Sequence, residues 1–335
     1  MKAVAFTHSL PIESPEALID VELPEPSPRH HDVLVEVRAV SVNPVDTKQR
    51  QRGEPLGEPR VLGYDAAGVV RSVGSEVTRF GIGDEVYYAG AVDRPGSNAQ
   101  YQLVDERIIA RKPHSLSFAE AAALPLTTLT AWEMLFDRFQ LPRDRAFHDT
   151  LLIVGGAGGV GSMAIQLASH LTGLTVIATA SRPETQEWCL SLGADHVIDH
   201  GRDLLAQFAT LHVPAPTSIF CTTHVDQHWQ ALCRLLAPEG KVGLIENVGM
   251  LDIAPLFSKA AALYTEYMFA RPLHATATMI EQHRILRTVS RLVDQGVLRT
   301  TMTTNFGRID AENLRRAHAA IESGKTRGKI VLEGF

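Results

Sequence analysis

The chain has 335 residues, of which 45% are hydrophobic and 21% are charged, and its formal net charge is −6. This length is sufficient for two domains with substantial cores. The negative charge and the lack of a basic run argue against nonspecific nucleic-acid binding. No apolar stretch reaches the length of about eighteen residues that a membrane span needs, so we expect none.

The cysteines and the first residues bear on the compartment. Cys189, Cys221 and Cys233 form no C-x-x-C pair, so neither a disulfide framework nor a cysteine zinc site is indicated. The apolar run Met1–Phe6 is too short for a secretory signal, and acidic residues soon follow. We therefore expect a cytoplasmic protein.

The first 120 residues are typical of a β-rich domain. Residues 33–40 have period-two patterning with a partly apolar second face, which predicts a strand, and proline clusters on both sides of it. Glycines flank a second short strand at 85–88. Around Phe118 the pattern changes, and an alanine-rich helix is expected at 119–124.

The middle of the chain alternates strands and helices. Amphipathic segments separate the expected strands, which are 151–154, 174–180, 195–199, 217–222, 241–246 and a sixth near 264–269. This alternation predicts an α/β fold with a doubly wound parallel sheet. From about residue 272 the chain returns to helix and strand, ending in an apolar run at 329–332.

A glycine-rich turn joins the first of these strands to the helix that follows. Gly156, Gly158 and Gly161 fit G-x-G-x-x-G, and apolar residues recur at helical spacing from Val160 to Leu171. Such glycines allow a tight turn, backbone approach to a pyrophosphate, and close packing of helix on strand. The helix N-terminus favours phosphate. We interpret the segment as a dinucleotide-binding loop; the alternative is a purely structural turn.

The end of the next strand indicates which dinucleotide binds. An NAD site usually places an acidic residue there for the ribose 2′-hydroxyl, but this chain has Ser181-Arg182. A hydroxyl and a guanidinium suit a 2′-phosphate, so NADPH is favoured over NADH. Ser181 is alternatively the cap of a helix that begins near Pro183, and both roles can hold at once.

Several motifs together resemble a known family. The chain is similar to medium-chain dehydrogenases/reductases of the zinc-free quinone oxidoreductase type, often labelled zinc-type alcohol dehydrogenase-like. The resemblance rests on Ser41–Asp46, Gly63–Gly68, Gly81–Val86, Leu124–Ala131, the glycine loop, Leu192–Asp199, Phe269–Arg271 and Gly324-Lys325. It implies a GroES-like catalytic domain built from residues 1–125 and 272–335, with a Rossmann domain at 126–271 between them.

The departures from the zinc enzymes point to metal-free chemistry. Zinc alcohol dehydrogenases carry a cysteine within the segment that here spans Val42–Asp46, and Gly-His-Glu where this chain has Gly63-Tyr64-Asp65. No cysteine lobe occurs near 90–100, and His224 and His228, four apart on an expected helix, lack a partner motif. Without a Lewis acid, reduction of an electrophilic acceptor is easier than alcohol oxidation.

The resemblance assigns residues to a site in the cleft between the domains. Asn43, Asp46 and Arg271 are the catalytic candidates; the alternatives are an Asx-type turn, a surface acid and an interdomain salt bridge. No general acid is evident, so water is expected to supply the proton. The cofactor-binding candidates are Thr127, Thr130, Gly156, Gly158, Gly159, Val160, Gly161, Ser181, Arg182, His200, Thr222 and Lys325.

The sequence therefore predicts an NADPH-dependent reductase of quinones or α,β-unsaturated carbonyls. An alcohol dehydrogenase-type oxidoreductase and a non-catalytic NADPH-binding protein are the alternatives. The family also commonly forms homodimers through the edge of the parallel sheet, here the strand expected at 264–269.

Overall fold

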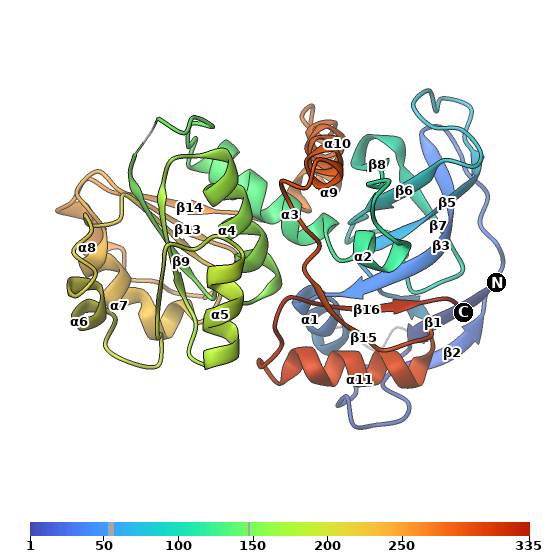
Figure 1. Ribbon diagram of the computed structural model, residues 1–335. Coiled ribbons are helices and arrows are strands. Elements are labelled where there is room, and N and C mark those ends of the chain that lie inside the picture. Colours follow the sequence, from blue (N-terminus) through green and yellow to red (C-terminus); the bar gives the residue numbers. More distant parts are fainter. Residues whose placement is uncertain (53–56, 147) are drawn as a thin grey trace. The chain divides into compact units, whose positions relative to one another are not determined.

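The computed structural model describes residues 1–52, 57–146 and 148–335. The chain divides into two compact units (Figure 1). Unit 1 consists of Met1–Leu126 and Phe269–Phe335, and unit 2 of Thr127–Met268. In the described part of the chain, no helix has the length and apolar character needed to cross a bilayer.

Unit 1 is built on a mainly antiparallel sheet to which both ends of the chain contribute. Its order is β15-β16-β3-β5-β6-β8, and β7 also pairs with β3. The strands are β3 (Asp32–Val42), β5 (Ala66–Val73), β6 (Glu85–Tyr88), β7 (Tyr101–Asp105), β8 (Ile109–Arg111), β15 (Met302–Asn305) and β16 (Lys329–Glu333). The C-terminal strand β16 pairs with β3, with Ile330 opposite Val42. This register brings Lys329 to the loop that follows β3.

A smaller sheet and several helices complete unit 1. The sheet has the order β2-β1-β4, with β1 (Lys2–Phe6), β2 (Ile19–Glu22) and β4 (Arg60–Val61). The helices are α1 (Pro44–Arg52), η1 (Glu106–Ile108), α2 (Phe118–Ala122), α9 (Ala270–Leu273), α10 (Glu281–Asp294) and α11 (Ala311–Glu322). α1 packs on α11, where buried Arg50 pairs with Glu322 at 2.5 Å. Burial and Arg50 together lower the pKa of His318 to about 3, so that imidazole is neutral.

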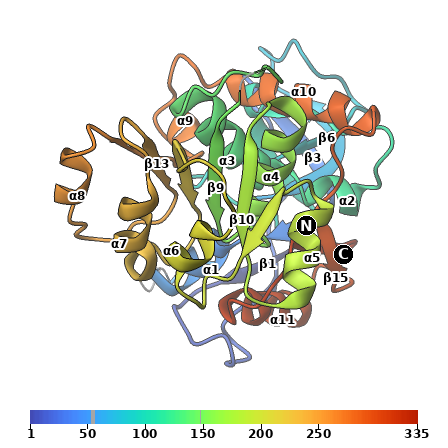
Figure 2. The same cartoon turned by 60° about the vertical axis from the view of Figure 1, so that its left-hand side comes forward.

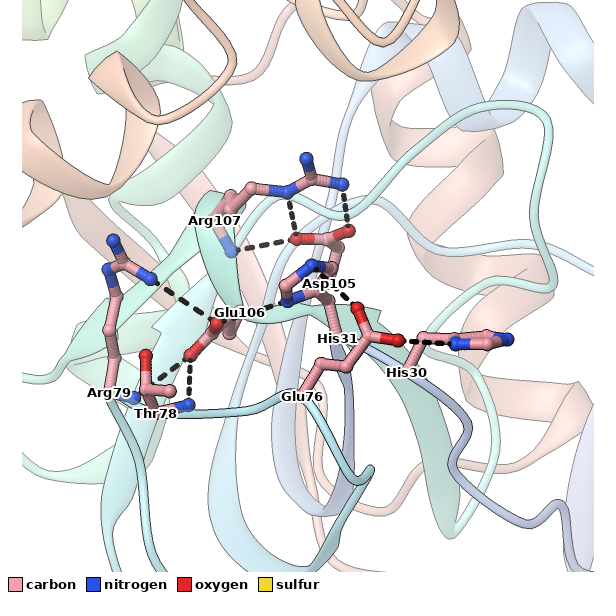
Figure 3. A network of polar contacts seen from close by, with 8 residues as sticks. All are labelled: His30, His31, Glu76, Thr78, Arg79, Asp105, Glu106 and Arg107. Carbon is pink, nitrogen blue, oxygen red and sulfur yellow. Dashed lines mark hydrogen bonds and ion pairs between the residues drawn. The ribbon is translucent and has the colours of Figure 1, made fainter.

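A polar network ties together three loops of unit 1 (Figure 3). The carboxylate of Glu106 is 1% exposed and accepts hydrogen bonds from the backbone N–H groups of Thr78 and Arg79 at 3.0 and 2.9 Å. His31 lies between Glu106 and Glu76, with nitrogen–oxygen distances of 3.3 and 3.2 Å. The buried carboxylate therefore satisfies loop N–H groups that no strand pairs.

Unit 2 is a six-stranded parallel sheet in the order β11-β10-β9-β12-β13-β14. Its strands are β9 (Thr150–Val154), β10 (Thr175–Thr179), β11 (His196–Ile198), β12 (Ser218–Cys221), β13 (Lys241–Leu244) and β14 (Ala262–Thr265). This order reverses direction at β9, as in the Rossmann fold. The predicted fold class is thus confirmed.

Helices cover both faces of this sheet. In Figure 1, α4 (Gly159–Leu171) and α5 (Pro183–Ser191) lie on one side of the strands, and α7 (Val225–Leu235) and α8 (Ala254–Phe257) lie on the other. On the second side, α6 (Leu204–Ala209), α7 and α8 bury a core against the strands that includes Phe208, Trp229 and Leu256. Figure 2 shows α6 beside α7, and these two helices are in contact. A longer helical segment, α3 (Pro125–Trp132), continues into the π-helical turn η2 (Glu133–Arg138).

The six expected strands of unit 2 all form, with one shift in position. β14 spans Ala262–Thr265, whereas the sequence placed the sixth strand near 264–269. The strand ends before Glu266, whose buried carboxylate pairs with Arg138 at 2.8 Å. A buried, charged Glu266 does not fit the apolar pattern of a strand, so β14 ends at Thr265. β14 is nevertheless the edge strand, as expected.

Candidate functional site

The glycine loop of unit 2 combines glycines that packing requires with one that it does not. A Cβ on Gly161 would lie 2.3 Å from the backbone oxygen of Gly155, and a Cβ on Gly156 would lie 2.8 Å from the Cβ of Ala178. A Cβ on Gly158 would meet only the Gly155 oxygen, at an ordinary 3.5 Å. Gly158 is also the N-cap of α4. The protein's own packing therefore leaves the space beside Gly158 open to a ligand.

The carboxyl ends of three neighbouring strands converge beside this loop. The backbone N–H of Gly155 donates to Oγ1 of Thr179 at 3.0 Å, and that hydroxyl lies 3.2 Å from Nδ1 of His200. From the end of β12, the hydroxyl of Thr222 donates to the Val154 oxygen at 2.7 Å. The structure thus brings the candidates His200 and Thr222 to the glycine loop. The sequence analysis missed Thr179, because it is the last residue of the largely apolar strand β10.

The end of β10 places a serine and an arginine before α5. Ser181 is exposed, and Arg182 is the N-cap of α5. Thr185 closes the helix start, accepting from the Arg182 N–H at 3.2 Å and donating to the Arg182 oxygen at 2.8 Å. The interpretation of Ser181 as the helix cap was therefore wrong by one residue. Nε of Arg182 pairs with Glu184 at 3.0 Å, which holds the guanidinium at this strand end.

Three imidazoles lie near one another at the strand ends of unit 2: His200, His224 and His228. The rings of His200 and His228 are 6.0 Å apart between centroids, and burial lowers the pKa of each. His224 lies outside the expected helix, since it is the N-cap of α7 with a left-handed φ of 51°. The neighbouring His224 lowers the pKa of both partners further. The lowered pKa values of His200 and His228 favour the neutral, hydrogen-bonding form of both imidazoles.

The remaining candidates of unit 2 lie in helices. Gly159 and Val160 form the first turn of α4, a helix of 13 residues whose first N–H groups have no partner within the helix. Thr127 and Thr130 are buried in α3. A helix N-terminus, an uncrowded Gly158 and hydroxyl-bearing strand ends fit the pyrophosphate and ribose of a dinucleotide.

Unit 1 contains a buried polar cluster in which four side chains meet: Asn43, Asp46, Asp65 and Lys329, each at most 3% exposed. Nζ of Lys329 donates to Oδ2 of Asp65 and to the backbone oxygen of Val42, both at 3.0 Å, and to Oδ1 of Asn43. Nδ2 of Asn43 donates to the same Asp65 oxygen at 2.7 Å. The amide of Asn43 is thus engaged at both ends inside the protein.

The two carboxyl groups of this cluster have different surroundings. Asp65 accepts from Asn43, from Lys329 and, through its second oxygen, from the N–H of Leu126 at 2.8 Å. Oδ2 of Asp46 accepts from the N–H of Asn43 at 2.6 Å, which is the backward-reaching half of a capping box at the start of α1. Oδ1 of Asp46 is buried and has no hydrogen-bond partner among the described residues.

Burial raises the pKa of both carboxyl groups. Desolvation raises the pKa of Asp46 to about 7, and Asp65 adds to the rise. The N–H groups of Asn43 and Gly63 and the ammonium of Lys329 act against it. Desolvation also raises the pKa of Asp65, while Lys329 and Asn43 oppose that rise. Asp65, which accepts three hydrogen bonds, is the better-stabilised carboxylate of the two.

Two further candidates of unit 1 lie on other elements. Arg271 is in the short helix α9 and is half-buried. Lys325 is exposed in the turn between α11 and β16. Sequence reasoning missed the role of Lys329, which it assigned only to the last strand. The available signal was the position of Lys329 beside an apolar run, because a lysine that is buried in a strand requires an acidic partner.

Parts of both units match known protein families. Residues 29–114 match the alcohol dehydrogenase GroES-like domain family, and residues 192–332 match the zinc-binding dehydrogenase family. A zinc-type alcohol dehydrogenase-like protein of Staphylococcus aureus is 43% identical over 335 residues, covering 99% of both chains. The chain belongs to the medium-chain dehydrogenase/reductase family. Its members are oxidoreductases, so the coarse functional class is established.

Other relatives of this medium-chain dehydrogenase/reductase carry different activities in their names. The crystal structure of a putative zinc-dependent alcohol dehydrogenase from Rhizobium etli has 54% identity and a TM-score of 0.95, covering 100% of this chain and 98% of that one. A quinone oxidoreductase from Coxiella burnetii has 29% identity and a TM-score of 0.82 over 100% and 99% of the chains. An NADPH-dependent alkenal/one oxidoreductase of Arabidopsis thaliana is 41% identical over 189 residues, which is 53% of this chain and 47% of that protein.

The residues of unit 1 do not fit the zinc that several of these names imply. Zinc sites need converging Cys, His or carboxylate ligands. Asp65 lies in the segment where the zinc enzymes have Gly-His-Glu, and it is bound to the ammonium of Lys329. Within residues 1–52, 57–146 and 148–335, no three His, Cys, Asp or Glu side chains are grouped so that they could hold a metal ion.

The Lys329–Asp65 pair leads to a stability prediction. Replacing Lys329 by Met leaves a buried carboxylate without its cation, so the free energy of unfolding at pH 8 should fall by about 3–5 kcal/mol. The loss should be smaller at pH 5, because Asp65, whose pKa burial already raises, then takes up a proton. Urea unfolding at the two pH values measures both effects.

The matched control for this experiment is Lys325→Met, which removes an exposed lysine in the preceding turn. It should change the free energy of unfolding by no more than about 0.5 kcal/mol. Equal losses in the two variants, or a loss for K329M that does not depend on pH, would contradict the assignment of a buried ion pair.

Proposed function

We propose that this medium-chain dehydrogenase/reductase is an NADPH-dependent reductase of quinones or α,β-unsaturated carbonyls. The observation that carries the proposal is the buried Lys329–Asp65–Asn43 cluster, which holds an ammonium where the zinc relatives hold metal-binding side chains. An alcohol must lose a proton before it yields hydride, and a metal commonly promotes that loss. A conjugated acceptor needs no such activation.

The cofactor assignment rests on the strand ends of unit 2. Bound NADPH supplies a hydride from its nicotinamide ring. Arg182 and Ser181 offer a guanidinium and a hydroxyl to a 2′-phosphate at the end of β10, where NAD enzymes carry an acidic residue. His200 adds a hydrogen-bonding imidazole from the end of β11. The loop around Gly158 receives the pyrophosphate, and Thr127, Thr130, Thr222 and Lys325 stay further candidate contacts.

The preference for NADPH can be measured directly. Arg182→Ala removes a charge-assisted contact worth about 1.5–3 kcal/mol, which is roughly a 10- to 150-fold loss in NADPH affinity with little change for NADH. Fluorescence titration gives both dissociation constants. Arg202→Ala is the control, since Arg202 is exposed and pairs with the nearby Asp199. Equal affinities of the parent for NADPH and NADH would refute the assignment.

For the acceptor, fixed donors near the developing oxyanion are the main requirement. The geometry changes the expected role of Asn43, because both ends of its amide already bind Lys329, Asp65 and the Ser41 oxygen. We therefore assign Asn43 to positioning Lys329 and Asp65. Arg271 stays the candidate donor to the acceptor oxygen.

A panel of quinones, enones and simple alcohols tests the reaction class. The parent protein should oxidise NADPH with some quinones or enones, and Arg271→Ala should lower turnover about a hundredfold. Arg284→Ala, which removes an exposed arginine of α10, should leave turnover unchanged. If the protein oxidises simple alcohols faster than it reduces any conjugated acceptor, the second candidate function is favoured. This is the alcohol dehydrogenase activity suggested by the names of relatives that match the chain over nearly its whole length.

We also propose a homodimer through the edge strand β14. The strand leaves unpaired backbone groups at the sheet edge, and exposed apolar side chains lie close to it in sequence. They are Met250 at 100%, Phe257 at 91%, Ile253 at 58% and Leu263 at 37% exposure. Sedimentation should give a dimer at micromolar concentration, and Leu263→Lys should shift it to monomer. A monomeric parent at those concentrations would rule the interface out.

A further inference from the structure

The cofactor assignment leaves part of the charge of a 2′-phosphate without a matching cation. A phosphate monoester carries about 1.5 to 2 negative charges at pH 7, because its second pKa is about 6. Arg182 supplies one positive charge, and its Nε is already paired with Glu184 at 3.0 Å. Arg202, which lies beyond the end of β11, is paired with Asp199 at 3.3 Å. A further positive charge at this edge of the sheet would therefore strengthen phosphate binding.

His200 follows β11 at the same edge of the sheet as the proposed phosphate site. The parallel strands β10 and β11 pair with Thr179 opposite Ile198, so Ser181-Arg182 and His200 follow paired positions. The imidazole is half-buried, and within the described part of the chain no hydrogen bond or ion pair engages its Nε2. This nitrogen is therefore available to a ligand that Ser181 and Arg182 hold.

The partner of the other ring nitrogen accommodates both charge states of the imidazole. Nδ1 of His200 lies 3.2 Å from Oγ1 of Thr179, and this hydroxyl oxygen accepts the N–H of Gly155 at 3.0 Å. A hydroxyl has one donor and two acceptor sites, so Thr179 can donate to a neutral ring and accept from a protonated one. Protonation of His200 therefore costs no hydrogen bond, and it leaves an N–H donor on each ring nitrogen.

The surroundings of His200 favour its neutral form in the free protein. Burial lowers its pKa most strongly, Asp199 raises it, and His224 lowers it. The ring of His228 lies 6.0 Å away between centroids. Burial and its two imidazole neighbours lower the pKa of His228, while Asp226 opposes them. Two imidazolium ions at this distance would repel each other, so we expect the pair to take up one proton rather than two.

Charged and titratable groups surround His200 on three elements of unit 2. They are Asp199 and Arg202 on its own loop, Arg182 and Glu184 at the start of α5, and His224, Asp226 and His228 at the start of α7. The two arginines of this set are each paired with a carboxylate. The imidazoles are therefore the groups that can gain a positive charge when an anion binds.

We propose that His200 is a specificity-determining residue that takes up one proton when the 2′-phosphate of NADPH binds beside it. The inference rests on the proposed function, because it requires NADPH as the cofactor. The protonated ring donates a charge-assisted hydrogen bond to a phosphate oxygen, which NADH lacks. The complex then holds a proton that the free protein does not, so NADPH affinity rises as pH falls and NADH affinity does not.

The test compares NADP⁺ with NAD⁺, which differ by the same phosphate and, unlike the reduced cofactors, are stable in acid. Titration calorimetry gives the two dissociation constants at pH 8 and at about pH 6.5, where most of the phosphate is still a dianion. The preference of the parent for NADP⁺ should be about 3- to 10-fold larger at the lower pH. One linked proton changes an affinity by at most about tenfold per pH unit.

His200→Gln removes the titrating group and keeps a hydrogen-bonding side chain of similar size. The variant should keep a preference for NADP⁺ through Arg182, but the preference should no longer increase as pH falls. His170→Gln is the matched control, because it removes an exposed imidazole from the last turn of α4. The control should show the pH dependence of the parent.

A second measurement needs only the parent, so it does not depend on how the variant folds. Calorimetry at pH 7 in two buffers of different ionisation enthalpy counts the protons that binding takes up. NADP⁺ should bind with net uptake of up to one proton, and NAD⁺ with none. In proton NMR, the ring Cε1–H resonance that H200Q lacks should titrate at a higher pH when NADP⁺ is bound.

The outcomes separate this inference from the proposed function. Equal affinities for NADP⁺ and NAD⁺ at both pH values would overturn the cofactor assignment of the proposed function. A preference for NADP⁺ that is the same or smaller at the lower pH, with no proton uptake, would leave that assignment standing and overturn the role of His200. A pH-dependent preference that H200Q retains would also overturn it, since another group would then take up the proton.

Discussion

The ion pair between Lys329 and Asp65 is the constraint on which the rest of unit 1 depends. A buried ammonium is tolerated only where carboxylate and carbonyl oxygens replace its water, and here Asp65, Asn43 and the Val42 oxygen do so. These partners come from β16, from the loop after β3 and from the segment before β5. The pairing of β16 with β3 is what brings them together. The cluster therefore forms only after both ends of the chain have joined one sheet.

The same pair explains why the two neighbouring aspartates differ in chemistry. A single lysine compensates a single carboxylate, and the hydrogen bonds of Asn43 and Leu126 favour Asp65 as that carboxylate. Desolvation by burial raises the pKa of Asp46 to about 7. The two carboxyl groups of this cluster thus differ in the hydrogen bonds that each accepts.

Sequence patterns predicted the architecture well because they report local periodicity. Each expected strand of unit 2 forms, and the glycine loop opens α4 as its spacing indicated. Errors occurred where tertiary contacts decide the outcome. β14 ends early at buried Glu266, and Arg182 rather than Ser181 caps α5. Lys329 and Asp65 are 264 residues apart, so no local pattern could pair them. The engagement of the Asn43 amide was hidden for the same reason.

The fate of isotopic hydrogen tests the central claim most directly. An open-chain enone is reduced with NADPH that carries deuterium at the transferred position of the nicotinamide, and the product is examined by NMR. The account predicts one deuterium at the β-carbon, a solvent-derived hydrogen at the α-carbon and an intact carbonyl. Deuterium on the carbonyl carbon, with an allylic alcohol as product, would identify an alcohol dehydrogenase-type reaction and contradict the account.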